Sequence, residues 1–409
     1  MQNVREDIQN KGVEQLFTYK NAIFSWSTGV GKTRPAIWAI KQLGNTAKVL
    51  IVVAERLHKN NWKQEFIDSG NLSLWKQVTI ICYASLKNYC NTSWDLVVLD
   101  EVHHIGSDLR LSYISTIQST YFLGLSATVS RKLIESLEKK LNRKFYISKI
   151  DLQEAIDYKI LGEPMIYLLP MTLNTRICTE EVIEEWGNKE QRKDYYCDYS
   201  GRWAFYRQRK TTYKNATLHI RCTQQQKYSF LCEQMEYYKR LYERTHNKRY
   251  ENTMLQWAIK RKFYLGNLKT QIVKGFLKKE EINNLRYICF CTNIEQADAL
   301  GKQDAIHSKK ANSNTVVKEF NEEQRNHLFA VGMAVEGVNL KNIEAGIIVQ
   351  LDGEILKFYQ KFGRTTRAKE PRQYIFYYKG TRDEEYLKKA IEGIDTTYIK
   401  QLDLYENTY

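Results

Sequence analysis

Ser27-Thr28-Gly29-Val30-Gly31-Lys32-Thr33 is the stretch of this chain that decides its fold. It follows an apolar run at 22–26 and precedes a helical pattern, which is the setting of a loop that wraps phosphate groups. Its glycines let backbone N–H groups approach the phosphates, its lysine reaches the outer phosphates, and its last threonine offers a hydroxyl to Mg²⁺. The strict pattern has glycine where this chain has Trp26. The sequence predicts a site for ATP and Mg²⁺ formed by Thr28, Gly29, Val30, Gly31, Lys32, Thr33 and Arg34.

The expected partner of this loop is an acidic pair at the end of another apolar strand. Residues 96–99 are Leu-Val-Val-Leu, and Asp100 and Glu101 follow directly. A carboxylate in this position holds Mg²⁺ through water, and its neighbour orients and deprotonates the attacking water. We expect the first role for Asp100, together with Thr33, and the second role for Glu101.

A second informative stretch, Gln360-Lys361-Phe362-Gly363-Arg364-Thr365-Thr366-Arg367, lies some 300 residues after the loop. Guanidinium groups stabilise the charge that spreads over the phosphoryl oxygens during transfer, so these arginines suit the γ-phosphate. A site whose parts are so far apart in the sequence implies two lobes that close on the nucleotide.

The layout of the chain agrees with two such lobes. Apolar runs alternate with helical patterns at 22–26, 49–54, 78–83, 96–100 and 121–126, and again at 287–292, 328–333, 346–351 and 374–378. Buried strands flanked by helices indicate an α/β fold with a parallel sheet in each part. We expect lobe 1 at 1–150, a connection and basic, mostly helical insert at 151–280, lobe 2 at 281–380, and one amphipathic helix at 381–409.

The net charge of +15 is concentrated in one segment. Residues 201–279 contain 19 basic and 4 acidic side chains, so this segment holds the whole excess. Aromatic residues are interleaved with the basic ones, a combination that suits phosphate contacts and base stacking. A solvated helical surface with core aromatics is the alternative. We expect nucleic-acid contacts from the insert residues Arg202, Arg207, Arg209, Lys210, Arg261 and Lys262.

Cysteine usage and hydropathy exclude other classes of protein. The chain has eight cysteines and no Cys-x-x-Cys pair, so we expect reduced cysteines and no zinc site. No apolar run approaches 18 residues, and the polar N-terminus is unlike a signal peptide. These features predict a cytoplasmic protein without membrane contact.

Several motifs together resemble those of the superfamily 2 helicases. Asp100-Glu101-Val102-His103 resembles their DExH box, and Leu125-Ser126-Ala127-Thr128 resembles their Ser-Ala-Thr motif. The order and spacing match along nearly the whole chain except 171–280. The similarity is to phage and restriction-enzyme helicases rather than to the RNA-directed DEAD-box group. The other stretches that carry it are 53–57 with Trp62 and Glu65, 152–156 with Leu161, 288–293, 332–340 and 360–367.

The resemblance implies a role for each matching residue. Lys32, Asp100 and Glu101 would run phosphate binding and hydrolysis in a RecA-like lobe. Arg364 and Arg367 would act as arginine fingers from a second such lobe. The remaining roles are water sensing by Gln360, adenine reading by Gln9, coupling by His103, Ser126, Ala127 and Thr128, nucleotide or nucleic-acid contact by Gly337 and Asn339, and backbone contact by Arg56.

The sequence therefore predicts an ATP-dependent helicase or translocase, with DNA favoured over RNA and with possible partner subunits. ATP-driven closure of the two lobes would unwind or remodel branched or duplex DNA. A duplex translocase that never separates strands, or an RNA helicase, is the first alternative. An ATP-gated nucleic-acid clamp with little motor activity is the second. If the gene is carried by a phage, the protein would work in the cytoplasm of the bacterial host.

Overall fold

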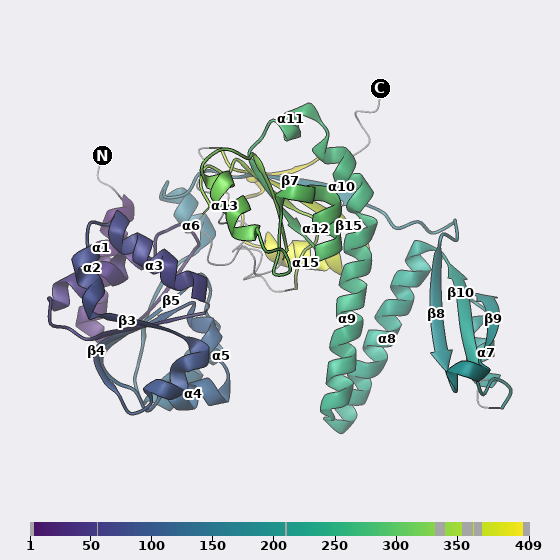
Figure 1. The fold of residues 1–409 in the computed structure, drawn as a ribbon, viewed down its shortest axis with the longest axis horizontal. Helices are drawn as coiled ribbons and strands as arrows, with labels where there is room; N and C mark the ends of the chain where they lie inside the picture. The colour runs from purple at the N-terminus through teal and green to yellow at the C-terminus, as the bar shows by residue number, and fades with distance from the viewer. Residues whose placement is uncertain are drawn as a thin grey trace. The chain divides into compact units, whose positions relative to one another are not determined.

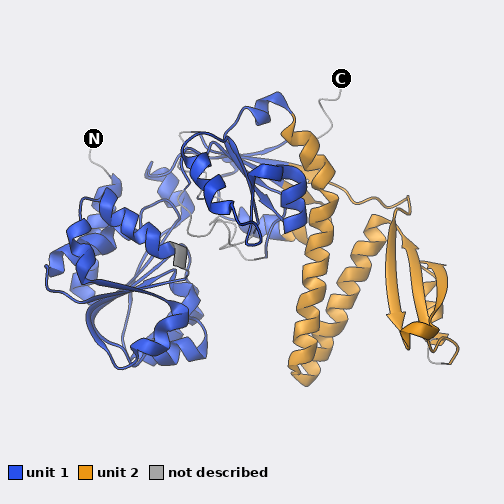
Figure 2. Ribbon diagram, viewed as in Figure 1, with its two compact units in different colours: residues 1–168, 279–375, 386–402 blue, residues 169–278, 376–385, 403–409 orange. Residues whose placement is uncertain are grey.

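The computed structural model describes residues 4–54, 56–208, 211–331, 340–353, 363 and 370–403. The chain divides into two compact units (Figure 2). The first unit comprises residues 1–168, 279–375 and 386–402, and the second comprises 169–278, 376–385 and 403–409. In the described part of the chain, no helix is both long enough and apolar enough to cross a membrane.

Lobe 1 is built on a six-stranded sheet in the order β3-β2-β4-β5-β1-β6. All neighbouring strands run parallel. The central strands are buried along nearly their whole length because helices cover both faces of the sheet (Figure 1). The strands are β1 (Asn21–Trp26), β2 (Val49–Val53), β3 (Val78–Cys82), β4 (Ser93–Asp100), β5 (Gln118–Ser126) and β6 (Tyr146–Ile150).

Apolar faces and polar caps define the helices of lobe 1. In α5, for example, the Ser130 side chain accepts the backbone N–H of Leu133 at the start, and Asn142 ends the helix with a φ of 51°. The buried leucines of α5 join a core cluster that also includes residues of β2, β4 and β5. The helices are α1 (Val4–Tyr19), α2 (Thr33–Leu43), α3 (Arg56–Asp68), α4 (Asp108–Ile114) and α5 (Arg131–Leu141).

Lobe 2 is built on a seven-stranded sheet in the order β12-β13-β11-β14-β15-β7-β16. Its core strands β11 (Tyr287–Cys291), β13 (His327–Val331), β14 (Ala345–Ile348) and β15 (Arg372–Tyr378) pair in parallel. These two parallel-sheet lobes confirm the predicted fold class of two RecA-like lobes. The other elements are α6 (Leu152–Asp157), β7 (Met165–Met171), α11 (Glu280–Asn283), α12 (Ile294–Gly301), β12 (Ala305–Ile306), α13 (Ser313–Asn321), α15 (Arg382–Ala390) and β16 (Ile399–Gln401).

The insert combines the predicted helices with a small sheet that the sequence did not reveal. Strands β8 (Glu180–Trp186), β10 (Ala216–Cys222) and β9 (Lys193–Asp198) form the sheet in that order, and α7 (Arg202–Gln208) packs on it. The long helices α8 (Gln224–Thr245) and α9 (Lys248–Leu268) then lie side by side (Figure 1), and α10 (Thr270–Leu277) follows. The run Glu-Glu-Val-Ile-Glu-Glu-Trp of β8 is too acidic to stand out as a strand in sequence.

The prediction of one helix over 381–409 is wrong beyond Ala390. Helix α15 ends there, and Gly393 follows in a left-handed conformation with a φ of 81°. The chain then enters β16, which pairs in parallel with β7. The reason lies in the sequence, because glycine stops a helix and the β-branched residues around 396–399 favour an extended chain.

A buried ion pair joins the end of α9 to the start of α15 within the second unit. Lys269 Nζ lies 2.6 Å from Asp383 Oδ2 and donates to the carbonyl oxygen of Phe376 at 3.1 Å. The two side chains are 0% and 1% exposed. Burial lowers the pKa of Lys269, and the Asp383 carboxylate opposes this shift. Each charge therefore depends on the other for its solvation.

Removing one member of this pair should destabilise the second unit strongly. We expect Lys269→Met to lower its free energy of unfolding by about 3–5 kcal/mol, because the Asp383 carboxylate stays buried without its cation. The double variant Lys269→Met/Asp383→Leu should recover much of the loss. Hydrogen exchange along α9 in increasing urea measures both effects.

The control for this prediction is Lys248→Met. Lys248 also pairs with a carboxylate, Glu251, but its side chain is 84% exposed, so exchange should not change. If α9 exchanged equally slowly in Lys269→Met and Lys248→Met, the buried pair would not stabilise the unit.

Candidate nucleotide site

The glycine loop between β1 and α2 has the backbone that a phosphate cradle requires. Gly29 and Gly31 have φ values of 98° and 91°, which side-chain-bearing residues rarely adopt. A Cβ on Gly29 would lie 2.7 Å from Leu161 Cδ2, and one on Gly31 would lie 2.5 Å from Gln9 Nε2. Both positions therefore need glycine for backbone conformation and for space. Lys32 lies at the start of α2, where its Nζ donates to the carbonyl oxygen of Trp26 at 2.9 Å.

Gln9 braces this loop from α1. Its Nε2 donates to the carbonyl oxygens of Val30 at 2.9 Å and Gly31 at 3.2 Å, and the residue is 5% exposed. Adenine reading by Gln9 stays a prediction, and it would have to use Oε1 because Nε2 is bound to the loop. Sequence reasoning placed Gln9 near the nucleotide but missed this supporting contact.

Asp100 lies at the carboxyl end of β4, two strands from the loop-bearing strand β1. Its Oδ2 accepts the indole N–H of Trp62 at 2.9 Å, and its backbone oxygen accepts the Tyr83 hydroxyl at 2.9 Å. Burial and then the neighbouring Glu101 raise the pKa of Asp100, whereas the Trp62 bond lowers it. An oxygen-donating carboxylate in this position fits Mg²⁺, which prefers hard oxygen ligands and its own waters.

Glu101 belongs to a hydrogen-bonded group that links the ends of β4 and β5. The residue is in a left-handed conformation with a φ of 49°. Its Oε2 lies 3.4 Å from both Ser126 Oγ and His103 Nδ1, and these two atoms are 3.1 Å apart. Ser126 Oγ also donates to the carbonyl oxygen of Thr128 at 2.8 Å. The structure thus brings together the DExH and Ser-Ala-Thr residues, including the buried Ala127, that the sequence assigned to catalysis and coupling.

The distant arginine stretch is described at only one residue. Gln360, Arg364 and Arg367 lie outside the described residues, and so do Gly337 and Asn339. Gly363 is described and lies against the glycine loop. A Cβ on it would be 2.3 Å from Thr28 Cβ, and its carbonyl oxygen would be 4.0 Å from a Cβ on Gly29.

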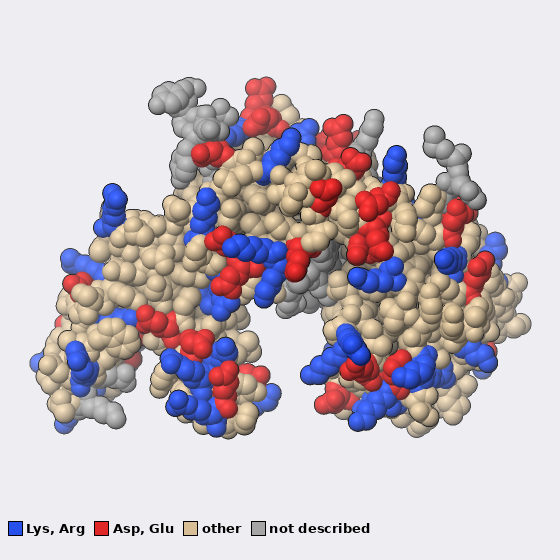
Figure 3. Space-filling model, turned by 180° about the vertical axis from the view of Figure 1, so that it is seen from behind, with Lys and Arg blue, Asp and Glu red and all other residues tan. Residues whose placement is uncertain are grey.

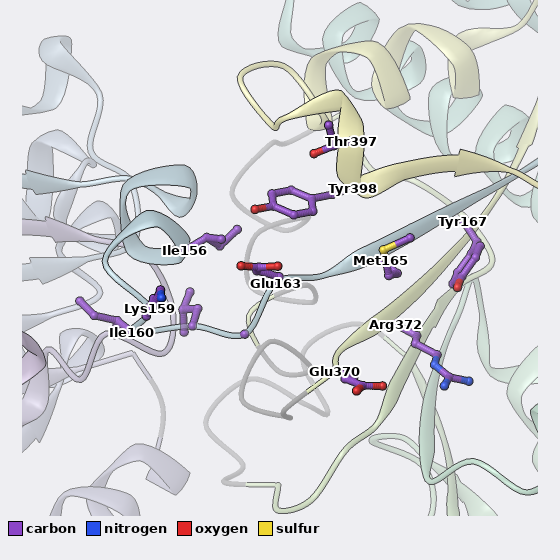
Figure 4. Close-up of a pocket in the computed structure, with 12 residues that line it drawn as sticks. Ile156, Lys159, Ile160, Glu163, Met165, Tyr167, Glu370, Arg372, Thr397 and Tyr398 are labelled. Carbon is purple, nitrogen blue, oxygen red and sulfur yellow. The ribbon is translucent and has the colours of Figure 1, made fainter. Parts of the chain in front are cut away.

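Of two pockets in the first unit, the smaller includes Ser27 of the loop in its lining and the larger includes no loop residue. A pocket of about 890 Å³ is lined by the connection, with Lys159 and Glu163, and by the lobe 2 sheet, with Glu370 and Arg372 (Figure 4). Its mixed charges do not favour an anion. A smaller pocket of about 320 Å³ is lined by the ends of β1 and β5, by α6 and by residues 392–394.

Two of the nucleic-acid contacts predicted for the insert are buried in the structure. Arg202 is 1% exposed, stacked at 3.9 Å on the Tyr199 ring and paired with Glu233. Arg261 is 6% exposed, and its Nη1 donates to Cys232 Sγ at 3.7 Å. Both guanidinium groups lie inside the packed insert, where aromatic and polarisable neighbours accommodate them. Neither can reach a phosphate in this fold.

The other predicted contacts differ in their accessibility. Arg207 is exposed and Lys262 is half-buried. Arg209 and Lys210 lie outside the described residues, and nothing is described of the Arg56 side chain at the start of α3. Figure 3 shows Lys and Arg gathered with carboxylates at the free end of the α8–α9 hairpin. Lys214, Arg221, Lys274 and Lys278 are also exposed, so the accessible basic residues of the insert are not confined to these two helices.

Trp62→Phe should make nucleotide binding more sensitive to acid. Loss of the indole N–H removes a bond to the charged carboxylate, so the pKa of Asp100 rises further and a proton stays bound up to higher pH. We expect the acid limb of Mg²⁺-dependent binding of a fluorescent ATP analogue to move to higher pH. Trp75→Phe is the control, because Trp75 packs on Phe66 and makes no described bond to Asp100. Coincident acid limbs for both variants would contradict the prediction.

Two family models match separate parts of this sequence. Residues 1–131 match the family described as type III restriction enzyme, res subunit, and residues 268–369 match the helicase conserved C-terminal domain. A putative DNA 3'-5' helicase Rad25 of Haloarcula marismortui is 28% identical over 144 residues. That match covers 31% of this chain and 23% of that protein, so the chain matches less than a quarter of its relative's length.

A solved structure is also similar over most of the chain. The crystal structure of the Pyrococcus furiosus Hef helicase domain has a TM-score of 0.46 at 15% identity, with 94% of this chain and 97% of that chain covered. The restriction-enzyme part of the predicted resemblance is confirmed by the family match, and the phage part stays a prediction. The two family matches occur in the order of the two lobes, and the glycine loop, DExH and Ser-Ala-Thr residues meet in one place. The two family matches support the predicted resemblance of this chain to the superfamily 2 helicases.

Proposed function

We propose that this protein is a nucleic-acid-stimulated ATPase that unwinds or remodels branched or duplex DNA by closing its two lobes on ATP. The observation that carries the proposal is the meeting of three motifs at the strand ends of lobe 1. They are the glycine loop after β1, the Asp100–Glu101 pair after β4 and the Ser126–Thr128 segment after β5. Each has the chemistry that phosphoryl transfer to water requires.

Each residue of the site then has a defined task. The loop N–H groups and Lys32 would hold the phosphates, while Thr33 and Asp100 would hold Mg²⁺. When bound, the ion would neutralise charge at the outer phosphates. Glu101 orients the attacking water and takes its proton, and the neighbouring His103 and Ser126 hold the Glu101 carboxylate in place.

Arg364 and Arg367 would complete the site from lobe 2. Gly363, their described neighbour in sequence, lies against Thr28 of the loop, which supports this role. Guanidinium groups delivered there would stabilise the charge of the transition state. Because the arginines belong to the second lobe, hydrolysis would depend on closure.

A pocket shared by the Ser-Ala-Thr segment and residues 392–394 supports the coupling of hydrolysis to movement. Ala127 and Thr128 line the smaller pocket together with Glu392 and Ile394. Just beyond, the backbone N–H of Asp395 bonds Gln153 Oε1 at 3.1 Å, and β16 then pairs with β7 of the lobe 2 sheet. A change at the Ser-Ala-Thr segment would therefore alter the wall of a pocket whose other wall leads into the second sheet.

Nucleic acid is the polymer that fits the charge of the chain. The insert segment 201–279 carries the whole net charge of +15, and a polyanion is its natural counterpart. DNA is favoured over RNA because the relative from Haloarcula is named a DNA helicase. Phosphate contacts dominate such binding, so sequence specificity should be low.

Lys32→Ala tests the nucleotide site. We expect ATP turnover to fall by at least about a hundredfold, because the variant loses the cation that stabilises the transferring phosphoryl group. Turnover is measured alone and with single-stranded, duplex, forked and branched DNA and with matching RNA. Unchanged turnover in Lys32→Ala would refute the site.

Strand-displacement and triplex-displacement assays, together with turnover, separate the alternatives. Strand displacement on forked DNA indicates a helicase, whereas triplex displacement without strand separation indicates a duplex translocase. Stimulation by RNA alone would reassign the substrate, and slow turnover that no nucleic acid stimulates would indicate a clamp.

Gly363→Ala tests lobe closure. Its Cβ would meet Thr28 Cβ, so the arginine stretch could not approach the loop closely. We expect ATP turnover to fall by about a hundredfold, while nucleotide affinity stays near wild type. Gly275→Ala in α10 is the matched control, because nothing lies within 4 Å of its added Cβ. Equal turnover in the two variants would show that Gly363 and Thr28 need no close approach.

A further inference from the structure

One face of α9 carries an exposed apolar stripe. Leu255, Ile259 and Phe263 are 50%, 51% and 38% exposed. They are spaced four residues apart, so they lie one helical turn after another on the same side of the helix. We call these three residues the α9 stripe. Exposed apolar side chains are common singly, whereas three in register on one helix mark a contact surface.

The packed side of α9 lies elsewhere on the helix, so the stripe is not part of the core. Trp257 contacts Phe230 of α8 with ring centroids 6.2 Å apart, and Arg261 and Leu265 are buried. Beyond the end of α9, the Lys269–Asp383 pair anchors the chain to the start of α15. The helix is therefore held on its packed side, which leaves the stripe facing outward.

The surroundings of the stripe are basic and rich in amides. Arg249, Lys260, Asn252 and Gln256 are exposed on the same helix. The single acidic residue of α9 is Glu251, which pairs with Lys248 at 3.1 Å. An acidic protein helix or a nucleic-acid strand would match this charge. The nucleic-acid strand matches better, because amides and lysines among apolar side chains serve phosphate, sugar and base contacts together.

We propose that the α9 stripe binds the sugars and bases of an unpaired nucleic-acid strand, while the flanking Arg249 and Lys260 bind its phosphates. The inference rests on the proposed function and names the substrate form that the insert takes. Duplex surfaces present phosphates outward, so a stripe of three apolar residues would face charge there. An unpaired strand exposes base faces and sugars, which apolar and aromatic side chains cover.

The test compares Ile259→Ser/Phe263→Ser with the wild-type chain. We expect the dissociation constant for a 30-nucleotide oligothymidylate to rise about tenfold or more, because aromatic and apolar base contacts are lost. The slope of affinity against salt should stay the same, since the phosphate contacts remain. Affinity for a blunt duplex should change less than twofold. Oligouridylate in place of oligothymidylate shows whether the same face takes RNA.

The matched control is Leu109→Ser in α4. Leu109 is 61% exposed in lobe 1, so the variant loses similar apolar surface far from α9 in the sequence. It should bind oligothymidylate like the wild type. Thermal unfolding of all variants checks that the insert still folds. If the serine variant does not fold, Ile259→Gln replaces it, because glutamine favours a helix.

Each outcome of this test is informative. Weaker oligothymidylate binding with an unchanged salt slope supports the inference. Unchanged binding overturns it, and unchanged binding together with altered self-association in light scattering would assign the stripe to contacts between copies. Equal losses for oligothymidylate and duplex would also overturn it, because the stripe would then not distinguish unpaired strands. If the wild-type chain bound no nucleic acid at all, the proposed function itself would fail.

Discussion

The carboxyl ends of parallel strands meet at one edge of a sheet, and the candidate site depends on this constraint. In lobe 1 the order β4-β5-β1 places three strand ends side by side. Strand β1 leads into the glycine loop, β5 into the Ser126–Thr128 segment and β4 into the Asp100–Glu101 pair. Side chains that are 25 residues apart in sequence thus come within hydrogen-bond distance, as Glu101 and Ser126 do. Residues in the loops at the strand ends can be exchanged without loss of the fold, whereas the order of the strands depends on the whole buried sheet.

Local sequence patterns explain why the two lobes and the site residues of lobe 1 could be predicted. Fully buried strands, glycines with positive φ and an acidic pair at a strand end are short-range signals, and they gave the lobes and the residues of lobe 1. The Trp62–Asp100 bond and the loop contacts of Gln9 join separate elements, so no local pattern contains them. The acidic strand β8 and the three-residue strand β16 were missed for the same reason, since their pairing with neighbouring strands stabilises them rather than their own residues.

In the insert, the number of basic residues in the sequence does not predict how many of them are accessible. Composition identified correctly where the positive charge of the chain lies, but it could not separate accessible from buried guanidinium groups. Arg202 is enclosed by Tyr199, Trp203 and Phe230, and Arg261 is packed beside Cys232. Arginine tolerates such surroundings because its planar, weakly hydrated group stacks on aromatic rings. Some of the insert's aromatic residues, such as Trp203 and Phe230, are thus engaged with a buried arginine, whereas Phe263 of α9 stays exposed.

The segment that follows the arginine stretch takes part in three regions of the fold. Within residues 370–403, Asp383 neutralises Lys269 at the end of α9, residues 392–394 line the pocket beside Thr128, and β16 pairs with β7. One continuous stretch therefore contributes to the insert, to the smaller pocket and to the lobe 2 sheet. Within the second unit, the buried ion pair fixes the start of α15 to the end of α9, because separating its members would leave a charge unsolvated.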